Sequence, residues 1–130
     1  MKVSKEKLNE WGAIILDSSI AVHKELGPGL LESAYKSALM YELKWRGLKV
    51  RANVPVDFVY KYALLDKVYV LDLLVENEII IEIKATEGLH PIFTAQLITY
   101  LKLYHRNLGY LINFNVPLLK DGFKRIVYNF

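Results

Sequence analysis

The 130-residue chain contains no cysteine, which excludes disulfides, thiolate metal sites and a cysteine nucleophile. No uncharged apolar run approaches the ~20 residues that a membrane-spanning helix needs, and the N-terminal segment lacks the continuous apolar core of a signal peptide. Seventeen basic against fourteen acidic residues give a net charge of only +3, which permits a nucleic-acid partner without requiring one. These absences predict a cytoplasmic protein with no membrane partner.

The chain has the length of one domain and a high content of hydrophobic residues. One hundred and thirty residues suffice for one buried core and are few for two, so we predict a single domain over residues 1–130. Hydrophobic residues make up 53% of the chain, and nine residues are tyrosines, whose amphipathic rings suit an interface. The composition therefore leaves both a monomer and a homodimer open.

Apolar spacing, glycine and proline divide the chain into helices and strands. Helical spacing predicts helices over residues 8–26, 30–45 and 91–104, and apolar runs predict strands over 49–60, 68–75, 78–85, 109–114 and 125–130. Pro55 lacks a backbone donor, which places the first strand at a sheet edge or at a bulge. The next two runs are apolar on both faces and are expected to be central and covered on both sides. This order predicts an α/β fold with a mixed central sheet flanked by helices.

Two of the predicted strands carry ionisable side chains. Asp72 interrupts the apolar run VYVLDLLV, and Glu82 and Lys84 end the run IIIEIKA. A carboxylate in an apolar setting normally shifts its pKa, pairs or coordinates a cation. Glu82 and Lys84 are two apart, so they project from one strand face while the intervening isoleucines project from the other. The spacing alone leaves open a divalent-metal site or an internal salt bridge.

The turn between these strands decides whether Asp72 and Glu82 can meet. Residues directly opposite in a hairpin lie on one face, so the pair requires an odd loop, such as residues 76–78, or a compensating bulge. A plain two-residue turn would separate the two carboxylates.

Four segments resemble one known family. Gly29, Glu32 and Tyr35 form a G-x-x-E-x-x-Y motif within LGPGLLESAY, and the segments DLLVENEIIIEIKA, AQLITYLKL and GYLINFNVPLLKDGFKRIV accompany it. From about His23 to Val127 the chain resembles the GxxExxY protein family, which is placed in the PD-(D/E)xK nuclease-like superfamily. The resemblance implies a restriction-endonuclease-like core, in agreement with the predicted order of elements.

The resemblance also implies the residues of a metal site. Asp72, Glu82 and Glu32 would be ligands of Mg²⁺, with Mn²⁺ as a substitute, and Lys84 would be the catalytic lysine. A hard divalent ion suits phosphodiester hydrolysis because it activates water and stabilises developing charge. Lys84 could orient the nucleophile or stabilise that charge. Glu32 would also act near the reacting centre, although a first-turn carboxylate is favoured by the helix dipole alone.

Two further positions accompany this set. Gln96 and Tyr100 resemble the Q-x-x-x-Y element of RecB-type exonucleases, with Gln96 at the catalytic site and Tyr100 supporting it. The two residues are i and i+4 on one helical face, so an ordinary hydrogen bond is the alternative. Tyr35 lies on the same face as Glu32 and is expected to give structural support.

The leading hypothesis is a Mg²⁺-dependent nuclease, a phosphodiester hydrolase or deoxyribonuclease that binds nucleic acid, DNA in the first instance. The alternative is a non-catalytic nucleic-acid- or protein-binding module that retains the acidic site. The three histidines lack ligand spacing, which argues against zinc.

Overall fold

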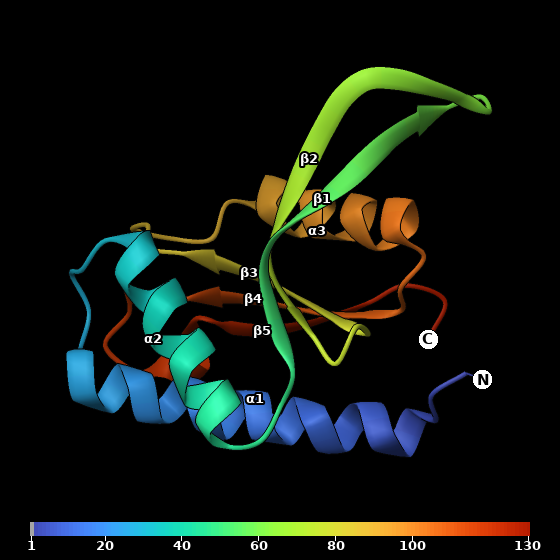
Figure 1. The fold of residues 1–130 in the computed structure, drawn as a ribbon. Coiled ribbons are helices and arrows are strands. Elements are labelled where there is room, and N and C mark those ends of the chain that lie inside the picture. Colours follow the sequence, from blue (N-terminus) through green and yellow to red (C-terminus); the bar gives the residue numbers. More distant parts are fainter. Residues whose placement is uncertain (1) are drawn as a thin grey trace.

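The computed structural model describes residues 2–130, which form a five-stranded sheet with helices on both faces (Figure 1). The helices are α1 (Lys5–Leu26), α2 (Glu32–Trp45) and α3 (Pro91–Tyr104). The strands are β1 (Val50–Tyr60), β2 (Ala63–Val75), β3 (Ile79–Lys84), β4 (Leu108–Asn113) and β5 (Phe123–Val127), and the short 3-10 helix η1 (Leu119–Asp121) precedes β5. This is the α/β fold that the sequence predicts.

The sheet is mixed, with the strand order β1-β2-β3-β4-β5. β3 and β4 are parallel and are joined through α3, whereas the other neighbours are antiparallel. Parallel neighbours need a long crossover, which the helix supplies. β1 lies at the edge, where the missing donor of Pro55 is tolerated. β3 is central and all but its last residue are buried, as its continuous apolar sequence predicts.

Two apolar clusters hold the helices against the sheet. One contains α1 and α2 residues such as Ile15 and Leu39 together with the odd-numbered isoleucines of β3. The other contains α3 residues such as Leu97 together with Ile80 and Leu111. Successive residues of β3 therefore face opposite layers, and any polar side chain on β3 must enter one of these layers.

Tyr35 fixes the connection between α1 and α2. Its buried hydroxyl donates to the Gly27 carbonyl oxygen at 2.5 Å and accepts from the Leu30 backbone N–H at 3.1 Å. The ring stacks on Phe114 with centroids 4.6 Å apart. These contacts tie the start of α2 to the end of α1.

Both strands of the β1–β2 hairpin rotate about their own axes partway along, so that their two faces exchange layers. On β1, Ala52 packs in the cluster beneath α1 and α2, whereas Val54 packs in the cluster beneath α3. Residues two apart on a regular strand share a face, so the strand rotates between them. Asn53 has a φ of 54° at this point, a region that asparagine tolerates better than most residues. β2 makes the same change between Leu71 and Leu73.

Beyond this rotation the hairpin leaves the sheet and projects beside α3 (Figure 1). We call residues 57–70 the arm. The prediction that residues 68–75 would be covered on both sides is wrong for the arm, because Val68 and Val70 are 60% and 46% exposed. A run of β-branched residues indicates a strand but not what covers it. The last strand also lies two residues earlier than predicted at its start, at Phe123.

Within residues 2–130, none of the helices combines the length and apolar character that crossing a membrane requires.

Candidate functional site

The β2–β3 turn has the odd length that brings Asp72 toward Glu82. Three residues, 76–78, join the strands, and the paired positions run from Val75 with Ile79 to Leu73 with Ile81. The next positions in this register are 72 and 82. Regular pairing stops just before them, at the point where β2 departs with the arm.

The Asp72 carboxylate replaces the missing backbone partner of β3. Its Oδ2 accepts a hydrogen bond from the Ile83 backbone N–H at 2.8 Å. Its Oδ1 lies 3.8 Å from Nζ of Lys36, which comes from α2 and also bonds to the Asn53 side chain. Asp72 is therefore held from β3 on one side and from α2 on the other.

Glu82 is buried beside Asp72, with 5% of its surface exposed. Its Oε1 has no hydrogen-bond partner among the described residues. The pKa of Glu82 is raised to about 10, mainly by burial and in addition by the neighbouring Asp72, whereas Lys84 opposes the rise. A buried carboxyl group beside a second carboxylate keeps its proton unless a cation compensates the charge.

Lys84 and Tyr100 lie on the α3 side of the sheet. Nζ of Lys84 is 4.4 Å from the ring centroid of Phe93, a residue of α3, so Glu82 and Lys84 share a strand face as their spacing predicts. Burial raises the pKa of the Tyr100 phenol, and the nearby Glu82 and Asp72 add to the rise. Tyr100 therefore approaches the acidic pair from α3.

Glu32, at the start of α2, shares a pocket with Asp72. The two residues line a small surface pocket of about 140 Å³ together with Ser33, Lys36 and Ile83, but Glu82 does not line it. Within residues 2–130, no three acidic, histidine or cysteine side chains are grouped closely enough to hold one metal ion. The structure thus brings the predicted ligands Asp72 and Glu82 together, and Glu32 shares a pocket with Asp72 but not with Glu82.

Gln96 is exposed on α3. It lines a separate pocket of about 310 Å³ with Tyr100, Phe58 and Tyr69, at the base of the arm. Its predicted partner Tyr100 is common to this pocket and to the surroundings of Glu82. No hydrogen bond joins Gln96 to Tyr100 within the described residues 2–130.

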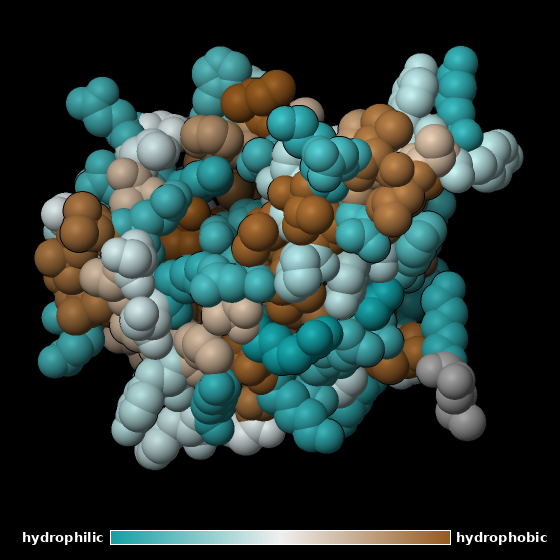
Figure 2. Space-filling view, turned by 45° about the horizontal axis from the view of Figure 1, so that its top comes forward, coloured by the Kyte–Doolittle hydropathy of each residue, from teal (hydrophilic) through white to brown (hydrophobic). Residues whose placement is uncertain are grey.

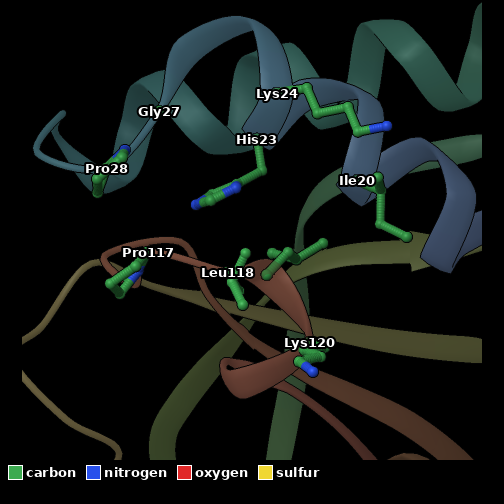
Figure 3. Close-up of a pocket in the computed structure, with 9 residues that line it drawn as sticks. Ile20, His23, Lys24, Gly27, Pro28, Pro117, Leu118 and Lys120 are labelled. Atoms are coloured by element: carbon green, nitrogen blue, oxygen red, sulfur yellow. The ribbon is translucent and has the colours of Figure 1, made fainter.

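A larger pocket, about 580 Å³, lies between the end of α1 and the segment that joins β4 to η1 (Figure 3). His23 points into it from α1, and its Nε2 is 2.8 Å from the Val116 carbonyl oxygen. Lys24 and Lys120 stand at its margin, and no carboxylate lines it. It shares no residue with the acidic site, so we do not assign the same chemistry to it.

Comparison with protein families identifies the superfamily of the chain. The family model of the PD-(D/E)XK nuclease superfamily matches residues 9–126, and the chain therefore belongs to the PD-(D/E)XK nuclease superfamily. Searches of curated proteins and of solved structures found no significant match. The family model therefore indicates a nuclease-like domain.

The residues of the acidic site fit the divalent ion that nucleases of this superfamily generally use. Mg²⁺ and Mn²⁺ prefer oxygen ligands, and Asp72 and Glu82 present carboxylates side by side. Glu82 Oε1 is the stronger evidence for a bound cation, because a buried oxygen without a hydrogen-bond partner costs free energy unless some other group satisfies it. A cation at this oxygen would favour the ionised carboxylate and so oppose the effect of burial on the Glu82 pKa.

Sequence reasoning did not assign Lys36 and Asn53 to the site. Lys36 is four residues after Glu32, so the two share a helix face, and this spacing could have drawn attention to it. The position of Asn53 depends on the left-handed backbone at the hairpin rotation. No local pattern in an extended strand predicts that rotation.

Proposed function

We propose that the chain is a metal-dependent nuclease that hydrolyses nucleic-acid phosphodiesters, with DNA as the first substrate to test and Mg²⁺ as the first ion. Within the superfamily we infer membership of the GxxExxY family, which the Gly29, Glu32 and Tyr35 motif supports. The observation that carries the proposal is the unpartnered Glu82 Oε1 beside Asp72. A stable core would gain nothing from two adjacent carboxyl groups in this layer, whereas a cation site requires them.

Asp72 and Glu82 would hold the ion. When bound, the ion supplies a water of lowered pKa and neutralises charge on the phosphate. The Ile83 N–H keeps the Asp72 carboxylate oriented, because it fixes one oxygen and leaves the other toward the pocket. Glu32 lines the same pocket and would contribute through it to the ion's surroundings.

Lys84 would act on the reacting phosphate or on the attacking water. Its ammonium lies over the Phe93 ring, on the strand face that it shares with Glu82. From there it could donate to a developing negative charge. We assign Gln96 to substrate contact, because it is exposed on the helix that carries Tyr100 to the acidic pair. All of these groups come from one chain, so the site would be complete in a monomer or in a homodimer.

A cleavage panel tests the proposal. Single- and double-stranded DNA and RNA are incubated with the protein and Mg²⁺ or Mn²⁺, with chelator as the blank. We expect cleavage that Asp72→Asn and Lys84→Ala lower by at least ~100-fold. The matched controls Asp17→Asn and Lys44→Ala change exposed residues of α1 and α2 and should cleave normally. Cleavage that persists undiminished in Lys84→Ala would indicate a contaminant or a different centre.

One observation favours a second candidate, a binding module that retains the acidic site without turnover. Asp72 already has partners in Ile83 and Lys36, as it would in a purely structural network. Thermal unfolding separates the two. If the carboxylates bind metal, Mg²⁺ or Mn²⁺ at 100 times the Kd should stabilise the native chain by about 2.7 kcal/mol and leave Asp72→Asn unchanged. An unchanged melting curve of the native chain favours the binding module.

A further inference from the structure

The arm carries a large apolar surface that the rest of the chain leaves exposed. Eight large hydrophobic side chains between residues 59 and 70 are at least 40% exposed, among them Tyr60, Tyr62 and Leu64 at 57%, 104% and 68%. Apolar side chains gather at the upper right of Figure 2, where the arm projects from the body of the molecule. Large contiguous apolar patches on a monomer normally mark an interaction surface.

The backbone of the arm is also unpaired on both outer sides. β1 is the edge strand of the sheet, and β2 pairs with β3 only through residues 73–75. Residues 63–70 of β2 therefore have a free edge, as does the whole of β1. An isolated two-stranded ribbon is marginal in water, and open edges favour pairing with another chain.

The charge of the arm indicates which partner suits it. Residues 57–70 contain two acidic side chains, Asp57 and Asp66, and two basic ones, Lys61 and Lys67. A surface that tracks a phosphate backbone needs an excess of lysine or arginine, which the arm lacks. A neutral surface with both signs is compatible with itself, and a two-fold contact brings the same patch of two copies together.

The exposed area of the arm is comparable to that of a standard interface. The eight side chains expose roughly 900 Å² in total over the two faces of the ribbon. Each partner of a standard stable interface contributes about 800 Å², so the contact reaches this size when a second copy covers both faces of the arm. Tyrosine is enriched among the residues that contribute most to such interfaces. We propose that the arm is the homodimerisation element of this protein, and that it pairs with the arm of a second copy of the chain.

Sedimentation equilibrium and light scattering between micromolar and 100 micromolar protein test this proposal. We expect the native chain to be a dimer. The variant Tyr62→Lys/Leu64→Lys adds charge to the exposed arm and should weaken the dimer at least tenfold. The control Leu31→Lys/Tyr41→Lys changes side chains that are 77% and 73% exposed on other surfaces, and it should remain a dimer.

A second measurement does not depend on how the arm variant folds. The chain has no cysteine, so Lys61→Cys provides a unique site for a spin label. Double electron–electron resonance should find a short intermolecular distance for a label on Lys61→Cys. A label on Lys44→Cys should give a longer distance. A native chain that is monomeric at 100 micromolar would overturn the proposal. A dimer that the Tyr62→Lys/Leu64→Lys variant leaves intact would also overturn it. So would a monomeric native chain whose oligonucleotide binding this variant weakens.

Discussion

Oδ2 of Asp72 accepts the hydrogen bond that the Ile83 backbone N–H would otherwise give to a neighbouring strand, at 2.8 Å. A side chain thus takes the place of a strand residue where β2 leaves the sheet. The same carboxylate lines the pocket that contains Glu32. One residue therefore closes the sheet and contributes to the candidate site.

This contact predicts different costs for two substitutions of Asp72. Asp72→Ala leaves the buried Ile83 N–H without an acceptor and should lower the free energy of unfolding by about 1–2 kcal/mol. Asp72→Asn keeps an oxygen in place and should cost clearly less. Urea unfolding in chelator measures both values. Equal losses for the two variants would mean that the hydrogen bond does not contribute to stability.

Burial of Glu82 predicts a pH dependence of stability in metal-free protein. The folded-state pKa of about 10 lies above the ordinary value of 4.5. The stability contribution of a group with a raised pKa is complete below the unfolded pKa and is lost as the pH rises toward the folded one. Stability should therefore fall between pH 4.5 and 10 in chelator.

Glu82→Gln should flatten this pH dependence, because an amide cannot ionise. At pH 8 in chelator we expect the variant to be more stable than the native chain by at least ~1 kcal/mol. Glu25→Gln, at an exposed position of α1, is the control and should follow the native curve. If Glu82→Gln keeps the native pH profile, another group causes the dependence.

Lys36 predicts an effect on metal affinity. Its ammonium lies 3.8 Å from Oδ1 of Asp72, so it competes with a cation for the same carboxylate. Both side chains are partly exposed, which limits the effect through solvent screening. Lys36→Gln should tighten Mn²⁺ binding by about 3–10-fold in calorimetric titrations. Lys24→Gln, at the separate pocket near His23, should leave affinity unchanged. Weaker binding in Lys36→Gln would instead mean that Lys36 positions Asp72.

Gly12 predicts a steric limit on the packing of α1. A Cβ atom at this position would lie 2.0 Å from Oη of the buried Tyr110. Gly12→Ala should therefore cost about 1–3 kcal/mol despite the better helix propensity of alanine. Tyr110→Phe in the same chain should recover most of the loss, because the clashing oxygen is gone. Gly88→Ala meets no atom within 4 Å and serves as the control.

Much of the fold follows from local pattern. Pro91 and the apolar spacing after it predict α3 to the residue, and Pro55 predicts an edge strand because it cannot donate to a ladder. The sequence also shows that Asp72 can meet Glu82 only if the turn between their strands has an odd number of residues. The three-residue turn 76–78 and the register of β2 with β3 meet this requirement.

The rest depends on contacts between distant segments. The exposure of Val68 and Val70 depends on where the hairpin leaves the sheet, because the same residues would be buried under a helix. Lys36 contacts both Asp72 and the Asn53 side chain, and Asn53 lies where the strand face reverses. Glu32 and Glu82 share the chemistry expected of ligands, but only Glu32 lines the pocket beside Asp72, and sequence spacing between a helix and a strand does not encode that difference.

The Ile83 N–H donates to the Asp72 side chain instead of to a strand backbone, and this affects where the chain can vary in length. The arm, residues 57–70, has no hydrogen-bonded ladder with β3. Residues can therefore be added to or removed from both of its strands together without shifting the register of Glu82. Relatives should therefore tolerate insertions and deletions there far better than in the three-residue turn at 76–78, where a single added residue would move one carboxylate to the wrong side of the sheet.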